Sequence, residues 1–188
     1  MGIRGRPGGS WQPVSRAALI GWLIFYGLLL AQAARAGFGD YLLLDYVNFF
    51  SHEGGHFFFS WFGETLTILG GTLAQLLVPL LLAVYFAWHR QTSAVAFASF
   101  WFFENFLPTG TYMADARIQT LPLVGPGGGD PEGHDWTNLF VMWNLLGYER
   151  QIGGTTRFLG WVGMLATIAW FIWTSRRTAS VSAVAARK

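Results

Sequence analysis

The chain has 188 residues, of which 53% are hydrophobic and only 12% are charged. A soluble domain carries roughly 25% charged residues, so this composition excludes a disordered chain and disfavours a soluble enzyme. The absence of cysteine excludes disulfides, iron–sulfur clusters and cysteine-based zinc sites. The 12 basic residues are scattered or terminal and the net charge is only +2, which argues against a nucleic-acid-binding surface. The composition therefore predicts an integral membrane protein.

Long apolar runs predict the membrane-crossing helices, each of which needs about 20 mostly apolar residues. A sixth and shorter run, residues 136–148, favours an interfacial or re-entrant helix. The predicted fold is an all-α polytopic helix bundle with about five to six transmembrane segments, forming a single membrane domain over residues 1–188. We expect the five longer helices over roughly residues 17–34, 41–62, 66–88, 93–107 and 158–173.

Basic residues near both ends of the chain predict its orientation. Arg4, Arg6 and Arg16 precede the first apolar run. Because basic residues favour the cytoplasmic side, we expect both termini in the cytoplasm, at a bacterial-type inner (plasma) membrane. This orientation requires an even number of crossings, so it needs residues 136–148 to cross as well. The basic residues that follow the last run are Arg176, Arg177, Arg187 and Lys188.

Three segments outside the apolar runs are predicted to be polar. Residues 1–16 are the N-terminal cytoplasmic segment, and residues 178–188 form a small, flexible C-terminal tail. Residues 108–135 contain a Gly-rich stretch followed by acidic residues and a histidine. We expect this last segment to form a polar loop between two apolar regions, and loops of such length are usually functional or disordered.

Residues 52–56, in the second apolar run, read His-Glu-Gly-Gly-His. Residues four apart share one helix face, so two imidazoles at this spacing can hold one zinc ion. Glu53 then stands beside the ion, where it can act as the general base on a water molecule. Asp45 and Asn48 lie on the same face and are expected to orient the His52 ring. The alternatives are buried hydrogen-bonded histidines or haem or pigment ligands, but ionisable groups in a membrane are costly and usually functional.

The third metal ligand is open on sequence grounds, because a catalytic zinc takes three protein ligands and one free position. Ligand chemistry favours His134, since imidazole is the better zinc ligand. Binding by both Asp115 and His134 would close the site with four ligands, which is typical of a structural zinc. The candidates are Asp115, His134, Asp135 and Glu104.

These residues resemble the site-2 protease family of intramembrane zinc metallopeptidases, over roughly residues 41–120. Besides residues 52–56, residues 69–75 (Leu-Gly-Gly-Thr-Leu-Ala-Gln) look like the Gly-rich helix of that family. Residues 105–108 (Asn-Phe-Leu-Pro), followed by Asp115, look like its Asn/Pro segment ending in a zinc-binding aspartate. The resemblance implies that Asp115 joins the two histidines as a ligand of Zn²⁺, and that Glu53 is the catalytic base.

The sequence thus predicts a zinc metallopeptidase-like protein that hydrolyses peptide bonds in or near the bilayer. Its expected partners are the lipid bilayer and a membrane-protein substrate or partner subunits, with no nucleic acid. An alternative from another class is a non-catalytic membrane subunit of a larger complex, in which the metal is structural. A metal-dependent lipid hydrolase is a third hypothesis.

Overall fold

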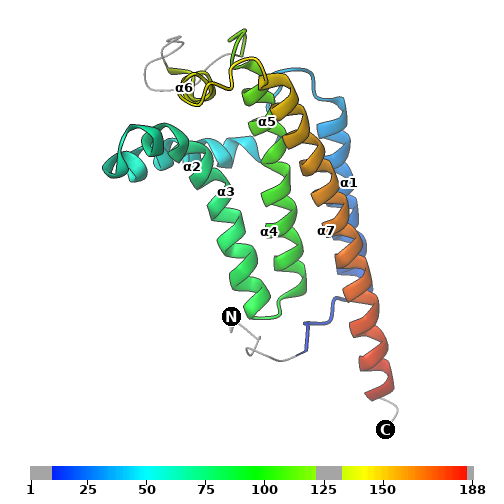
Figure 1. The fold of residues 1–188 in the computed structure, drawn as a ribbon. Helices are drawn as coiled ribbons and strands as arrows, with labels where there is room; N and C mark the ends of the chain where they lie inside the picture. Colours follow the sequence, from blue (N-terminus) through cyan, green and yellow to red (C-terminus); the bar gives the residue numbers. More distant parts are fainter. Residues whose placement is uncertain (1–9, 122–132, 186–188) are drawn as a thin grey trace.

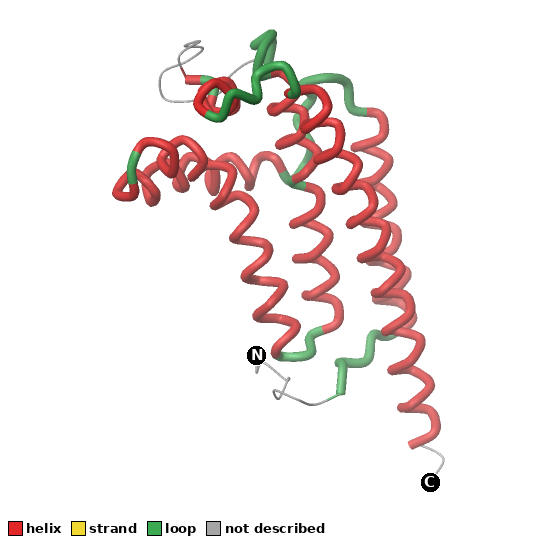
Figure 2. Tube along the Cα trace, viewed as in Figure 1, coloured by secondary structure: helices red, strands yellow, loops and turns green. Residues whose placement is uncertain are grey.

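The computed structural model describes residues 10–121 and 133–185, and these residues form helices without any strand (Figures 1 and 2). The prediction of an all-α fold is confirmed for this part of the chain. In chain order the elements are α1 (Arg16–Arg35), α2 (Asp45–Phe59), the 3₁₀ helix η1 (Ser60–Phe62), α3 (Glu64–Trp88), α4 (Thr92–Glu104), α5 (Phe106–Asp115), α6 (Asp135–Met142) and α7 (Glu149–Ala185).

Three helices are long and apolar enough to cross a membrane: α1, α3 and the first 31 residues of α7. Beside these helices, α4 and α5 follow one another along nearly one line and are separated only at Asn105 (Figure 1). They are called the α4–α5 pass, and neither helix is among the three that are long enough to cross a membrane. Pro108 gives the physical reason for that break, because it has no N–H for the carbonyl of Glu104. The start of α1 and the end of α7 lie at the same end of this bundle (Figure 1).

The second predicted crossing is instead a short helix that lies across the other end of the bundle. With 15 residues, α2 is about 22 Å long, which is shorter than the roughly 30 Å of a hydrocarbon core. The first part of α3 runs back beside α2, and α3 then bends down the bundle (Figure 1). Pro79 inside α3 cannot donate to the carbonyl of Gln75, which is a sufficient cause for a bend.

Other differences from the predicted elements also concern length. With eight residues, α6 is about 12 Å long and cannot cross, so three long helices stand against the five to six segments expected. The predicted polar loop over 108–135 begins as helix, because α5 continues to Asp115, and residues 122–132 lie outside the described residues. The predicted flexible tail is helical up to Ala185.

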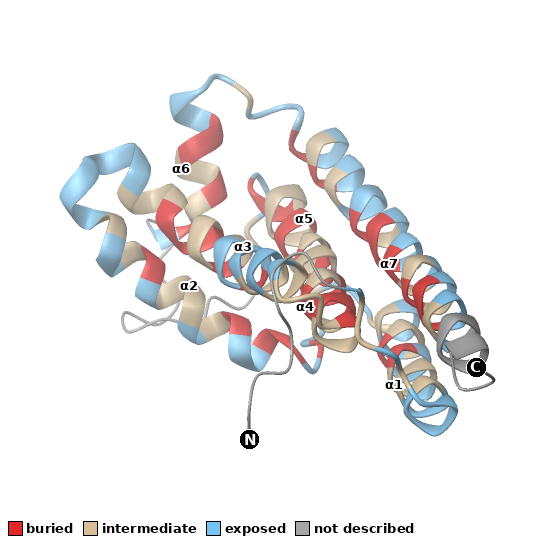
Figure 3. Cartoon of the chain, turned by 90° about the horizontal axis from the view of Figure 1, so that it is seen from below, coloured by how far each residue is buried: buried red, intermediate tan, exposed pale blue. Residues whose placement is uncertain are grey.

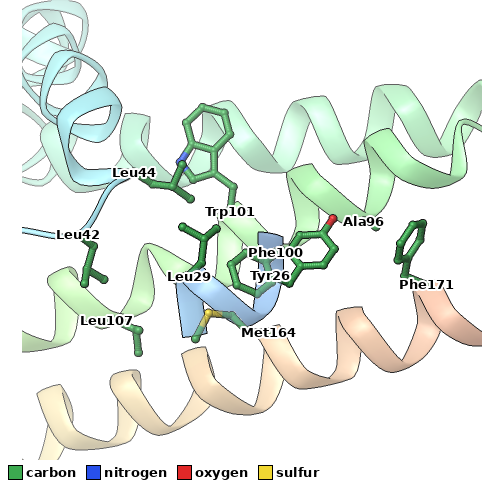
Figure 4. Packing of buried hydrophobic residues seen from close by; sticks show 10 residues of the cluster. All are labelled: Tyr26, Leu29, Leu42, Leu44, Ala96, Phe100, Trp101, Leu107, Met164 and Phe171. Atoms are coloured by element: carbon green, nitrogen blue, oxygen red, sulfur yellow. The ribbon is translucent and has the colours of Figure 1, made fainter. Parts of the chain in front are cut away.

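Two apolar clusters fix the helices relative to one another. In the larger one, Tyr26 of α1 stacks on Phe100 of α4 at 4.8 Å between ring centroids, and Phe171 of α7 meets Tyr26 edge-on (Figure 4). The buried sides of α4, α5 and α7 face each other, while the outer sides of α1 and α7 are exposed (Figure 3). The smaller cluster, Ala116, Trp136, Leu139 and Phe140, packs α6 against the end of α5.

Candidate metal centre

Two helices bring three potential metal ligands together. His52 and His56 lie on α2, and Asp135 is the first residue of α6. The Oδ2 atom of Asp135 lies 3.1 Å from His52 Nε2 and 3.3 Å from His56 Nε2. The ligand atoms of this group, the His/His/Asp group, all lie within 4.8 Å of one another. Two ring nitrogens and a carboxylate oxygen thus converge on one small volume.

The opposite ring nitrogens are held by oxygen atoms of α3. His52 Nδ1 lies 3.1 Å from the side-chain oxygen of Gln75, and His56 Nδ1 lies 2.8 Å from the backbone carbonyl of Thr67. A carbonyl oxygen only accepts hydrogen bonds, so each Nδ1 is assigned as the protonated donor. A neutral ring then has its lone pair on Nε2, which faces Asp135, whereas a ring that is also protonated at Nε2 donates a hydrogen bond to that carboxylate. This is the arrangement that orients histidines as metal ligands.

Gly71 lies directly against the Nε2 atoms of the two histidines. A Cβ atom added at Gly71 on α3 would lie 2.5 Å from His56 Nε2 and 2.6 Å from His52 Nε2. The two rings can therefore lie this close to α3 only because residue 71 has no side chain. Two imidazoles and one carboxylate are one of the donor sets that bind zinc in catalytic sites.

Close packing of α2 on α3 fixes the distance between the two histidines and α3. A Cβ atom at Gly70 would lie 2.8 Å from the backbone oxygen of Gly55, and one at Gly55 would overlap the backbone oxygen of Gly70. The two helices can approach this closely only because both residues are glycine. The approach brings Thr67, Gly71 and Gln75 of α3 against the two histidines.

The charges of the group favour a cation between its members. The hydrogen bond to Asp135 raises the pKa of His56 to about 8, although burial opposes the shift. Burial raises the pKa of Asp135, but hydrogen bonds from His52 and His56 outweigh it and hold that pKa below its ordinary value. The negative charge of an ionised Asp135 beside these ring nitrogens is balanced either by a proton on His56 or by a metal ion.

Two further side chains border the group. Glu53 is half-buried and follows His52 on α2. The hydroxyl of Tyr112, on α5, accepts a hydrogen bond from the backbone N–H of Asp135 at 3.0 Å. Its ring lies 6.4 Å from the ring of His52 and 4.3 Å from that of His134. No sequence signal marked Tyr112, whereas Gly71 and Gln75 were marked as part of a Gly-rich helix.

Asp115 and His134 form a separate, closed pair. Asp115 accepts hydrogen bonds from the backbone N–H and hydroxyl of Thr120 and from the backbone N–H of Leu121, at 2.9 to 3.0 Å. His134 Nδ1 accepts from the backbone N–H of Thr137 at 3.2 Å, so it caps the start of α6. His134 Nε2 lies 3.6 Å from Asp115, and both side chains are fully buried.

Of the predicted metal residues, the structure brings His52 and His56 together with Asp135, one of the wider set of candidates. The His/His/Asp group does not include Asp115 or His134. The reason is local: the turn after α5 occupies both oxygens of Asp115, and helix capping occupies the lone pair of His134. The pair instead anchors the start of α6, which places Asp135.

The expected orienting role of Asp45 and Asn48 is also taken by another residue. Asn48 accepts a hydrogen bond from the Trp101 ring N–H at 2.7 Å and donates to Asp45 at 3.4 Å. These contacts fasten α2 to α4. Gln75 on α3 is the side chain that holds the His52 ring. Glu104 is buried, and the His/His/Asp group does not include it.

Comparison with known proteins gives no support beyond this geometry. No protein-family model, no curated protein and no solved structure matches the chain. The functional argument therefore rests on the His/His/Asp group and its surroundings.

Proposed function

We propose that this protein is a membrane-embedded zinc metallopeptidase, similar to the site-2 protease family, with His52, His56 and Asp135 as metal ligands. The observation that carries the proposal is the placement of the ring nitrogens: both Nδ1 atoms face carbonyl oxygens of α3, and both Nε2 atoms face the Oδ2 atom of Asp135. Two ring nitrogens and a carboxylate oxygen within 4.8 Å of one another are close enough to bind one ion. Gly71, which lets both Nε2 atoms lie against α3, supports the same conclusion.

The number of ligands favours catalysis over a structural role. Three protein ligands leave one coordination position open, whereas structural zinc sites are closed by four. When bound, the ion lowers the pKa of water and polarises a carbonyl group. Glu53, one residue after His52, is the base that accepts the proton of the attacking water and later passes it to the leaving amine.

Tyr112 has the position of a donor to the developing negative charge. Its hydroxyl oxygen is fixed by the N–H of Asp135, and within the described part of the chain the hydroxyl donates no hydrogen bond. Its proton is therefore free to stabilise an oxyanion on the substrate, a contribution that grows as charge develops in the transition state. Asp115 and His134 are positioning residues, because they act through the start of α6.

The test of the proposal is a substitution that removes the base and keeps the ligands. Glu53→Gln should retain about one zinc per chain, while cleavage of fluorogenic peptides in lipid vesicles falls by about 10²–10⁴. Glu64→Gln makes the same chemical change at an exposed position at the start of α3 and should alter neither property. Cleavage by Glu53→Gln at the wild-type rate would contradict the proposal. Full zinc content without any cleavage by the wild type would favour the membrane subunit.

A second variant tests the oxyanion donor. Tyr112→Phe keeps the ring and removes the hydroxyl, so kcat should fall by about 10²–10³ with zinc content retained. Tyr148→Phe, at a position that is 60% exposed, is the matched control. An unchanged kcat in Tyr112→Phe would restrict Tyr112 to holding the backbone of Asp135.

A further inference from the structure

One end of the bundle is basic. It contains the start of α1, the α3–α4 turn and the late part of α7 (Figure 1). These parts are in contact: the N–H of Gln12 donates to the carbonyl of Arg90 at 2.9 Å, and the rings of Trp11 and Trp170 lie 5.1 Å apart. The guanidinium of Arg90 covers the Trp11 ring at 5.0 Å. The described basic residues of this end are Arg16, Arg90, Arg176 and Arg177, and those toward the opposite end are Arg35, Arg117, Arg150 and Arg157. The two ends therefore differ in their acidic residues and in the basic residues of the two chain termini.

The described acidic residues lie elsewhere. They occupy the α1–α2 connection, α2, the starts of α3, α6 and α7, and the α4–α5 pass. In the sequence, the nine residues before the described part and the three after it add four basic residues and no acidic one. The acidic residues in question are Asp40, Asp45, Glu53, Glu64, Glu104, Asp115, Asp135 and Glu149.

The His/His/Asp group lies at the end opposite the basic one. Both of its helices, α2 and α6, are at the end of the bundle where α1 and α5 finish and α7 begins (Figure 1). Basic residues flanking membrane helices face the cytoplasm, because this distribution sets the orientation at insertion. The basic end is therefore cytoplasmic, and the metal group is on the other side.

Aromatic side chains give the depth of the group. Away from the histidines, α2 and η1 expose Phe50, Phe57, Phe58 and Trp61 by 62 to 81%. A helix that lies across the bundle and exposes aromatic rings is typical of the boundary between headgroups and acyl chains. The metal group, carried by the same helix, then lies at that boundary and not at the centre of the bilayer.

We infer that the candidate metal site opens at the extracytoplasmic surface of the membrane, at the level of the lipid headgroups. Its substrate class is then an extended polypeptide segment with apolar flanks that lies on that surface. The apolar residues of the substrate pack on the exposed rings of α2 and η1, while its peptide bond reaches the half-buried histidines. The substrate class rests on the proposed function, whereas the side of the membrane does not.

Single cysteines test the orientation cleanly, because the natural chain has none. Phe38→Cys lies in the α1–α2 connection, where Phe38 is 58% exposed, and Ala179→Cys lies at an exposed position late in α7. In intact cells a membrane-impermeant maleimide should label Phe38→Cys, and should label Ala179→Cys only after permeabilisation. The reverse pattern, or labelling of both in intact cells, would overturn the inference.

A second pair of positions protects the test against a misfolded variant. Ile118→Cys, in the turn after α5, should behave like Phe38→Cys, and Gln91→Cys, in the α3–α4 turn, like Ala179→Cys. Labelling of each variant in detergent gives the maximal maleimide labelling of its cysteine, against which the labelling in intact cells is compared. Agreement of the two pairs supports the orientation, and disagreement between them overturns it.

Access to the metal is the complementary measurement. External EDTA should remove zinc from the protein faster in sealed right-side-out vesicles than in sealed inside-out vesicles. Faster loss from inside-out vesicles would overturn the inference. A wild-type protein that binds no zinc would sink the proposed function, while the cysteine pattern would still decide the orientation.

Discussion

Two clusters of histidine and aspartate stand within a few residues of each other and differ in what they can bind. His52, His56 and Asp135 are partly exposed, with side-chain accessibilities of 14 to 26%, whereas Asp115 and His134 are fully buried. Both clusters contain the residue types that zinc prefers. The difference lies in where their lone pairs point.

Hydrogen-bond partners decide that direction. The Nδ1 atoms of His52 and His56 face carbonyl oxygens, so their Nε2 atoms face Asp135, where an ion can replace a proton. In His134 the backbone N–H of Thr137 occupies the Nδ1 lone pair, so Nε2 carries the proton and points to Asp115. A metal-ligating histidine is therefore recognised by the acceptor behind its ring, and not by residue type or spacing alone.

The largest expected effect is the loss of zinc when a side chain is added at Gly71. In Gly71→Ala the new methyl group would lie within about 2.6 Å of both Nε2 atoms, so zinc content should fall to background while the helices still form. Gly54→Ala adds the same methyl group where no atom lies within 4 Å and should retain zinc. Metal analysis of the purified proteins, with circular dichroism for helix content, checks both. Full zinc in Gly71→Ala would place the ion elsewhere.

Removing the acceptor behind one ring should have an intermediate effect. Gln75→Ala leaves His52 Nδ1 without its partner, and loss of such an orienting contact typically weakens metal binding 10–100-fold. Gln151→Ala, at an exposed position early in α7, is the matched control. Competition with a chromophoric chelator measures the affinity. Equal affinities of the two variants would mean that Gln75 does not hold the ring.

The smallest effect is the dependence of zinc affinity on pH. The pKa of His56 is raised to about 8, mainly by its hydrogen bond to Asp135, so the metal-free protein holds this proton below that pH. Zinc must displace it, and its affinity should fall about tenfold per pH unit below 8 and level off above. In Asp135→Asn, which is expected to lose zinc, the pKa of His56 in the metal-free protein should return toward its ordinary value, and an NMR titration of the His56 ring measures it. A His56 pKa that stays near 8 in this variant would show that Asp135 does not cause the shift.

The sequence predicted the parts of this protein that depend on local pattern. Low charge and apolar runs predicted α1, α3 and α7, and the spacing of His52 and His56 predicted a shared helix face. It predicted five to six segments, whereas three helices of the described residues are long and apolar enough to cross, because an apolar run such as 41–62 also suits a short helix. Pro79 and Pro108 mark the bend and the break, but a proline alone does not say how far a helix turns.

The third ligand could not be singled out from the sequence. Asp115, His134 and Asp135 all lie near the end of an apolar run, and their roles depend on contacts between separate segments. Asp115 is closed by the turn that follows it, His134 by the helix that it begins, and only Asp135 faces α2. The choice follows from the packing of α6 on α5, which no spacing along the chain encodes.

The most direct test compares zinc binding by Asp135→Asn and Asp115→Asn. Each change replaces a carboxylate by an amide of nearly the same shape in one of the two clusters. Asp135→Asn should lose zinc and keep its thermal stability. Asp115→Asn should keep about one zinc per chain and lose about 1–3 kcal/mol of stability, because its amide group cannot accept all the hydrogen bonds of the turn. Retained zinc in Asp135→Asn together with its loss in a folded Asp115→Asn would contradict the assignment of Asp135 as the third ligand.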